Sequence, residues 1–355
     1  MADSYAGQTT RTETVVAIQY LRAIAASLIA FQHAMGVPAF AHYAAHFGTV
    51  GVDIFFVISG FIMWTTTECR NRGPAAFWLA RIVRIVPLYW LFTTIYIAAA
   101  LITPESFFVV KLDPVHIVKS FLFVPAAHPT LGLVAPVYTL GWTLNYEMFF
   151  YLLFGLCLFV PWPRLRFALI AGAFLALVAT GELVHPNGAV ARTYTDPILL
   201  EFLAGVMLAI VSPLLMRCGA VAGMALMAGA ALWVAIVYGY GFALERIVSH
   251  GIPAVVAVTG ALMAEPAARA RPSRLGLTLG DASYAIYLAH PFAQRLWLIA
   301  VNRTAGIAAI SPTLYVFAAF VIGLFGGVIC HFLIERPLLI AGRRLVGRAQ
   351  PQPTR

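Results

Sequence analysis

The sequence predicts an all-α membrane protein, built as a polytopic bundle of about ten transmembrane helices. Of its 355 residues, 61% are hydrophobic and 10% are charged, and the mean hydropathy is +0.88. Soluble globular domains carry about 25% charged residues. Apolar stretches of about 20 residues, the length that a helix needs to cross a bilayer, cover most of the chain. The composition therefore excludes an ordinary soluble fold.

Ten stretches of the chain have the length and composition of a membrane-spanning helix. They lie near residues 15–36, 48–67, 79–102, 138–160, 165–183, 195–215, 220–240, 247–264, 280–301 and 310–334. The longest connection, residues 103–137, is too short for an independent soluble domain. We therefore predict a polar cytoplasmic tail over residues 1–14, a single transmembrane domain over residues 15–338 and a basic cytoplasmic tail over residues 339–355.

The distribution of Lys and Arg sets the predicted orientation. If the N-terminus is cytoplasmic, sixteen of the 23 basic residues fall in cytoplasmic segments, five fall on the opposite side, and Arg22 and Arg295 lie within spans. Because cytoplasmic loops collect Lys and Arg, both termini are predicted to be cytoplasmic. The basic C-terminal tail then faces the lipid bilayer, and we expect no nucleic-acid partner. The scattered Cys and His residues predict no metal site.

The first span carries the most informative pair of residues, Arg22 and His33. Eleven helical residues advance about 16 Å and rotate by about 20° beyond three full turns, so both side chains share one face at two depths. A charged side chain inside the bilayer costs about 3 kcal/mol on insertion scales and normally faces a polar interior. Arg22 therefore predicts an internal polar pocket, into which His33 also points as a group that exchanges a proton.

The second span contains GVDIFFVISGF, with Asp53 one turn inside its outer end and with Ser59 and Gly60 near mid-depth. Two interpretations of Asp53 remain open. Its carboxylate either caps the start of the helix or pairs with His33 and fixes the tautomer of the imidazole. Gly60 allows a neighbouring helix to approach closely.

The third span opens with RIVRIVPLYW, in which Arg81 and Arg84 lie one helical turn apart at the cytoplasmic border. Guanidinium groups bind phosphate oxygens through a planar fork of donors, so the pair is a candidate anion clamp. The alternative is that both arginines anchor the helix on the cytoplasmic side.

The fourth span contains WTLNYEMFFY and places Glu147 near the middle of the membrane. An intramembrane carboxylate needs a partner, and Arg22 lies at a comparable depth, so we predict an ion pair between them. This pair is either part of a reaction site or purely stabilising. Trp142 and Tyr146, with Asn145 between them, are either packing residues or a platform for a sugar.

The ninth span contains LGDASYAIYLAHPF, which includes Ser283, Tyr287 and His290. Ser283 has the position of a helix-start residue, and His290 is either a hydrogen-bonded core residue or a group that faces the pocket. The tenth span ends in IERPL, where Pro337 is expected to stop the helix at the cytoplasmic border.

The order of these motifs resembles that of the acyltransferase 3 family of integral-membrane O-acyltransferases. Arg22 and His33 match the family's signature of Arg, ten residues and His, and the later motifs follow over about residues 17–338. IQYLRAIAA and WTLNYEMFFY look most like the exopolysaccharide-acetylating type. The resemblance implies transfer of an acyl group, most commonly acetyl, from cytoplasmic acyl-CoA to a hydroxyl of an exported or lipid-linked glycan at the bacterial inner membrane.

The same resemblance implies acyl-CoA, most commonly acetyl-CoA, as a co-substrate, with no tightly bound cofactor. We expect the protein to lack the periplasmic hydrolase-like domain that some members of the family carry. We therefore expect help in delivering the glycan acceptor to come from another protein, such as a polysaccharide-assembly protein.

Residues and resemblance together define three groups of candidate site residues. The catalytic candidates are His33, Arg22, Glu147 and Asp53. The acyl-CoA-binding candidates are Arg81, Arg84, Ser59 and Gly60. The substrate-lining candidates are Trp142, Asn145, Tyr146, Ser283, Tyr287 and His290. In this scheme His33 either removes the proton of the acceptor hydroxyl or itself carries the acyl group.

A different class of protein fits some of the same features. A transporter or flippase for a lipid-linked saccharide would also line its path with Arg22, Glu147 and His33. No second half of the chain echoes the LRAIAASLIAFQH segment, although such repeats are often invisible in sequence. A third class, a non-catalytic membrane scaffold, would not explain why Arg22 and His33 lie on one face of the same helix.

Overall fold

The computed structural model describes residues 15–36, 46–70, 73–102, 112–304 and 311–349. The regular secondary structure of these residues is helical, apart from an isolated antiparallel bridge between Ala127 and Val134. The prediction of an all-α protein is thereby confirmed.

The α-helices follow the order of the apolar stretches. They are α1 (Val16–Ala34), α2 (Val50–Arg70), α3 (Pro74–Ile102), α4 (Pro114–Phe121), α5 (Trp142–Cys157), α6 (Pro163–Val184), α7 (Ala189–Tyr194), α8 (Leu199–Leu215), α9 (Ala220–Gly239), α10 (Ile252–Ala270), α11 (Arg274–Asp281), α12 (Ser283–Thr304), α13 (Pro312–Cys330) and α14 (Arg336–Ala349). Short 3₁₀ turns, His46–Thr49 and Thr139–Gly141, precede α2 and α5, and π-helical turns, Ile247–Gly251 and His331–Glu335, precede α10 and α14.

Seven helical stretches of the described residues are long and apolar enough to cross a membrane. They are Phe47–Glu68, Pro74–Ile102, Pro163–Val184, Ala189–Leu215, Ala220–Gly239, Ile247–Ala270 and Pro312–Leu345. The other three predicted spans also fold as helices, namely α1, α5 and α12. α5 has 16 residues, and α1 and α12 carry polar side chains such as Arg22 and His290. The shorter or more polar helices are therefore those that carry much of the predicted site.

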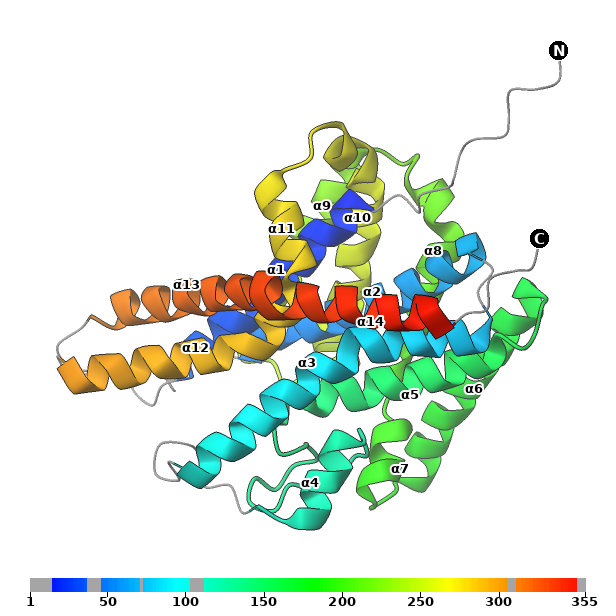
Figure 1. Cartoon of the computed structure of the whole chain (residues 1–355). Helices are drawn as coiled ribbons and strands as arrows, with labels where there is room; N and C mark the ends of the chain where they lie inside the picture. The colour runs from blue at the N-terminus through cyan, green and yellow to red at the C-terminus, as the bar shows by residue number, and fades with distance from the viewer. Residues whose placement is uncertain (1–14, 37–45, 71–72, 103–111, 305–310, 350–355) are drawn as a thin grey trace.

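The predicted end of the tenth span is wrong. α13 runs into the π turn His331–Glu335, and α14 begins directly after it, with Pro337 in its first turn. Proline lacks an N–H and its ring clashes with the carbonyl one α-helical turn earlier. The wide π turn changes the position of that carbonyl, so the chain continues as a helix. α14 then packs on α3 across the front of the molecule (Figure 1).

α1 lies at the centre of the bundle, where it packs against α2, α10, α11, α12 and α13 (Figure 1). Its buried surface includes Ala25, Ala26 and Ala30, none of which has any exposed area. Small side chains let helices approach one another closely inside a membrane. The helix that carries Arg22 and His33 is therefore enclosed by helices from both halves of the chain.

α2 and α8 cross at two glycines, as the sequence predicts for Gly60. A Cβ atom at Gly60 would lie 2.0 Å from the carbonyl oxygen of Phe202, and one at Gly205 would lie 2.0 Å from the carbonyl oxygen of Val57. The two backbones therefore touch with no side chain between them. The Phe150 ring of α5 stacks on Phe202 of α8 with 4.4 Å between centroids, which fixes the helix that carries Glu147.

Candidate active site

Three arginines from two helices meet in a narrow pocket of about 80 Å³ inside the bundle, which we call the arginine pocket. Arg22 comes from α1, and Arg81 and Arg84 come from the first turns of α3. Ser59, Glu147, Ser283, Tyr284 and Tyr287 also line it, together with apolar residues of α2. The helical spacing of Arg81 and Arg84 therefore places both guanidinium groups in one pocket, as predicted.

Arg22 is buried, with 8% of its surface exposed. Its Nη1 donates to Gln19 Oε1 at 3.1 Å, and its Nη2 donates to Ser283 Oγ at 2.8 Å. Arg81 also lies in a protein environment, because its guanidinium carbon is 5.8 Å from the centroid of the Phe77 ring. The Arg81 Nε is buried and has no hydrogen-bond partner among the described residues, which leaves a donor available for a ligand.

The predicted ion pair between Arg22 and Glu147 is wrong. Both side chains line the arginine pocket, but the Glu147 carboxylate accepts hydrogen bonds from Ser59 Oγ at 3.0 Å and from the Tyr151 hydroxyl. Hydroxyl groups on its own and the neighbouring helix therefore satisfy Glu147, while Ser283 satisfies Arg22. With three guanidinium groups and one carboxylate among its lining residues, the pocket carries a net positive charge and suits an anion.

A second, larger pocket of about 470 Å³ contains His33, and we call it the histidine pocket. His33 lies in the last turn of α1 and is exposed to the pocket. Gln32, Thr49, Trp142 and Tyr287 also line it. The expectation that Arg22 and His33 share one pocket is corrected, because their rise of about 16 Å along α1 places them in different ones. Val52 and Tyr287 belong to both linings, so the two pockets adjoin.

The partner of His33 is His290, not Asp53. His290 is completely buried, and its Nε2 lies 3.2 Å from His33 Nδ1. His290 Nδ1 is 2.9 Å from the carbonyl oxygen of Ile286, and His33 Nδ1 is 2.9 Å from that of Ile29. A carbonyl only accepts, so both Nδ1 atoms carry the proton when the rings are neutral. His33 Nδ1 then donates to both Ile29 and His290, and its unprotonated Nε2 remains for chemistry.

The partner of Asp53 is Arg246, which none of the sequence motifs contains. Its side chain is completely buried, and its Oδ2 accepts a hydrogen bond from Arg246 Nη2 at 2.8 Å. Arg246 lies on the segment just before α10, outside every motif, and its one sequence signal is that it belongs to the few basic residues on the predicted outer side. The predicted pairing of Asp53 with His33 is therefore wrong.

The remaining predicted residues are divided between the pockets and the packing around them. Ser283 and Tyr287 line the arginine pocket, and Trp142 and Tyr287 line the histidine pocket. Tyr146 donates to Asp196 Oδ2 at 3.4 Å, and Asn145 is buried among the helices. Gly60, predicted to bind acyl-CoA, instead lies against the backbone of α8. Among the residues that the structure describes, no group of three His, Cys, Asp or Glu side chains is placed to hold a metal.

The structure is a helical bundle of apolar spans in which a cationic pocket adjoins a pocket with an accessible imidazole, an arrangement suited to transfer of a group from an anionic donor. A family model described as an acyltransferase domain matches residues 15–332. The chain therefore belongs to the acyltransferase 3 family and is an integral-membrane acyltransferase. The family implies an acyl donor. The resemblance seen in the sequence motifs is thereby confirmed.

Three relatives place the chain within this family. It is 40% identical over 315 residues, 85% of this chain and 95% of the relative, to the exopolysaccharide production protein ExoZ of Rhizobium meliloti (strain 1021). It is 25% identical over 338 residues, 86% of this chain and 84% of the relative, to the acyltransferase MdmB of Streptomyces mycarofaciens. It is 28% identical over 191 residues, 47% of this chain and 30% of the relative, to the peptidoglycan O-acetyltransferase OatA of Listeria monocytogenes. No solved structure matches the chain.

Proposed function

We propose that this protein transfers an acetyl group from cytoplasmic acetyl-CoA to a hydroxyl of an exopolysaccharide or of its lipid-linked precursor, in the bacterial inner membrane. The similarity to a protein named for exopolysaccharide production supports the acceptor, and the similarity to an O-acetyltransferase supports the acyl group. The observation that carries the proposal is the position of the arginine pocket beside the histidine pocket, with Val52 and Tyr287 in both linings.

The arginine pocket suits the donor. Coenzyme A carries several phosphate oxygens, which Arg81 and Arg84 would bind as planar forks near the cytoplasmic start of α3. The long arm of the donor then extends along the narrow, mostly apolar lining toward Val52 and Tyr287. Arg22, held by Ser283, would orient the arm of the donor within the arginine pocket, before that arm reaches His33.

The chemistry follows from the free Nε2 of His33. As the acceptor oxygen attacks the thioester carbonyl, His33 Nε2 takes the hydroxyl proton. The carbon–sulfur bond then breaks, and the proton passes to the sulfur, so that coenzyme A leaves as the thiol. In a covalent variant, His33 Nε2 attacks the thioester carbonyl, the carbon–sulfur bond breaks, and coenzyme A leaves as the thiolate. The acceptor hydroxyl then attacks the acetyl-imidazole, the Nε2–acetyl bond breaks, and the hydroxyl proton passes to the thiolate. His290 supports both routes, because it holds the proton of His33 on Nδ1.

The topology that fits this scheme has ten spans, with α1, α5 and α12 completing the seven apolar ones and with both termini cytoplasmic. Residues 15–338 would form the membrane domain, between cytoplasmic tails at residues 1–14 and 339–355. The arginine pocket then opens toward the cytoplasm, where the donor is made, and His33 lies near the outer end of α1. A polysaccharide-assembly protein would present the growing glycan at that outer side.

Purified protein in lipid nanodiscs tests the proposal directly. With [¹⁴C]acetyl-CoA and exopolysaccharide from cells that lack this protein, we expect acceptor-dependent labelling of the glycan and release of an equal amount of free thiol. His33→Ala should abolish both, while His185→Asn, a change in an exposed loop histidine with φ of 46°, should abolish neither. Movement of a lipid-linked saccharide across vesicles without thiol release would instead identify a flippase.

A further inference from the structure

The lining of the histidine pocket differs in charge from that of the arginine pocket. Asp, Glu, Lys and Arg are all absent from its described lining, which offers the uncharged hydrogen-bonding groups of Gln32, Thr49 and Thr139 beside the ring of Trp142. A pocket of this size, with few polar groups and an aromatic wall, is typical of small-ligand sites. Its chemistry matches a ligand with many hydroxyl groups and no charge.

Gln32 supplies the sharpest indication that a hydroxyl binds here. Its Oε1 is enclosed by protein and accepts no hydrogen bond from the described residues. An enclosed amide oxygen without a donor is unfavourable, and a ligand hydroxyl would supply the missing donor. Gln32 directly precedes His33 on α1, and both line this pocket. A hydroxyl bound to Gln32 therefore lies in the same pocket as the imidazole that must deprotonate an acceptor.

Trp142 is held in place by an ion pair behind it. The guanidinium carbon of Arg246 lies 5.5 Å from the centroid of the Trp142 ring, and Arg246 in turn donates to the buried carboxylate of Asp53 at 2.8 Å. The Tyr146 ring packs edge-on against Trp142 at 5.9 Å. Asp53 offsets the positive charge of Arg246, and the pair orients the aromatic wall.

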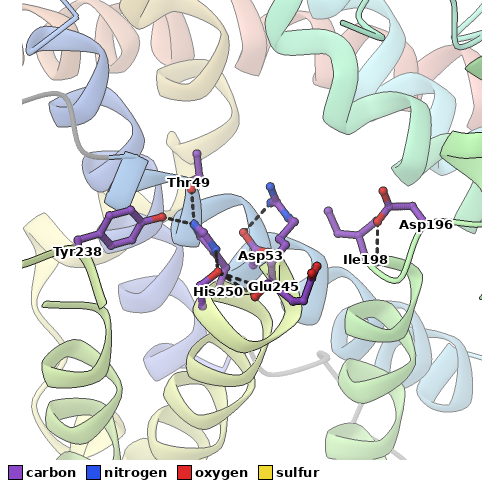
Figure 2. A network of polar contacts seen from close by, with 9 residues as sticks. Thr49, Asp53, Asp196, Ile198, Tyr238, Glu245 and His250 are labelled. Carbon is purple, nitrogen blue, oxygen red and sulfur yellow. Dashed lines mark hydrogen bonds and ion pairs between the residues drawn. The ribbon is translucent and has the colours of Figure 1, made fainter. Parts of the chain in front are cut away.

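The wall around Thr49 is fixed by the same polar network. Figure 2 shows Thr49, Tyr238 and Asp53 grouped around His250 and the π turn before α10. His250 Nε2 lies 2.6 Å from Thr49 Oγ1 and 2.5 Å from the Tyr238 hydroxyl, and His250 Nδ1 lies 2.6 Å from Ser249 Oγ. One side of the pocket thus consists of side chains whose positions are set by hydrogen bonds.

We propose that the histidine pocket is the acceptor subsite and that it selects a neutral sugar residue over a uronate. Gln32 binds a hydroxyl beside His33, Trp142 packs on the sugar ring, and the Asp53–Arg246 pair is a positioning device for Trp142. The inference rests on the proposed acetyl transfer and adds the substrate class to it. It also gives Asp53 a role that does not require contact with His33.

Matched acceptors test the substrate class. Nanodisc-bound protein is supplied with [¹⁴C]acetyl-CoA and either a β-linked glucose trisaccharide or the trisaccharide whose terminal residue is glucuronate. We expect kcat/KM for the neutral trisaccharide to exceed that for the glucuronate compound by tenfold or more, about 1.4 kcal/mol. Equal or better use of the glucuronate compound would overturn the inference.

Variants test the assignment of residues. Gln32→Ala and Trp142→Phe should each raise the KM for the neutral trisaccharide about fivefold or more, with the KM for acetyl-CoA unchanged. Asp53→Asn should raise the acceptor KM while leaving kcat nearly intact, and Trp162→Phe, at an exposed position before α6, should change nothing. A change in the donor KM instead of the acceptor KM would refute the acceptor subsite.

Direct binding separates this inference from the proposed function. Quenching of tryptophan fluorescence by the neutral trisaccharide, reduced in Gln32→Ala and absent with the glucuronate compound, supports the subsite even if no acetyl transfer is found. In that case the proposed transfer fails and the subsite stands. If the glucuronate compound is acetylated and Gln32→Ala has no effect, the proposed transfer stands and the acceptor subsite fails.

Discussion

His290 Nε2 lies 3.2 Å from His33 Nδ1, where the last turn of α1 meets α12. The Nδ1 atom of each ring also faces the carbonyl oxygen four residues earlier on its own helix. Each carbonyl therefore fixes one tautomer, and the two fixed tautomers are complementary, with a donor on His33 facing an acceptor on His290. The pair orients His33 much as a carboxylate does in a Ser-His-Asp arrangement, but without placing a second charge in the membrane interior.

We expect His290→Leu to lower kcat about tenfold, with little change in either KM. The loss is moderate because the carbonyl of Ile29 still holds the proton on His33 Nδ1. His290→Gln should recover part of the rate, since its amide oxygen can replace Nε2 as an acceptor. A purely structural role would lower protein yield and stability in both variants without this recovery.

Arg81→Ala and Arg84→Ala should each raise the KM for acetyl-CoA about tenfold, because each removes a charged donor to a phosphate oxygen. The matched control is Arg164→Ala, an exposed arginine in the first turn of α6, which should leave the KM unchanged. If the two α3 variants instead reduce insertion into the membrane and leave the KM as it is, the anchoring interpretation is correct.

Val52→Phe should block acetyl transfer and leave binding of the donor intact. Val52 is buried and lies in the lining of both pockets, so a larger ring would fill the path from the arginines to His33. Val52→Ala should remain active. Measurement of acetyl-CoA binding and of acetyl transfer on the same sample separates the two effects. A fully active Val52→Phe would show that the donor does not reach His33 past Val52.

Gly205→Ala should lower the free energy of unfolding by about 2 kcal/mol, because the added methyl group meets the carbonyl oxygen of Val57 and forces α2 and α8 apart. Gly172→Ala is the control, since a Cβ there would meet no described atom within 4 Å apart from the chain neighbours and backbone of its own helical turn. Thermal unfolding in detergent checks both. Equal midpoints for the two variants would contradict the tight crossing.

The sequence patterns predicted the parts of the site that depend on one helix. The spacing along α1 gave the two depths of Arg22 and His33, although the single pocket predicted for them is wrong. The one-turn spacing of Arg81 and Arg84 placed both in the same pocket. These results follow from helical geometry, which is local.

The partners across helices were less predictable. Glu147 bonds to Ser59 and Tyr151 rather than to Arg22, and Asp53 bonds to Arg246 rather than to His33. Such pairs depend on the rotation of each helix about its axis and on the order of helices in the bundle, neither of which is encoded in the spacing of residues along one span. The π turns before α10 and α14 also left no signal in the apolar pattern.

The shared wall of Val52 and Tyr287 has a consequence for the cell as well as for the reaction. The Tyr287 hydroxyl donates to the carbonyl oxygen of Leu140 at 2.7 Å. This hydrogen bond holds the ring in place between the arginine pocket and the histidine pocket. An enzyme that admits one substrate from each face of a membrane risks becoming a leak for ions. In the proposed reaction, the tethered ring would keep the water of the two pockets apart while the thin acyl chain passes beside it, and the proton gradient would be preserved.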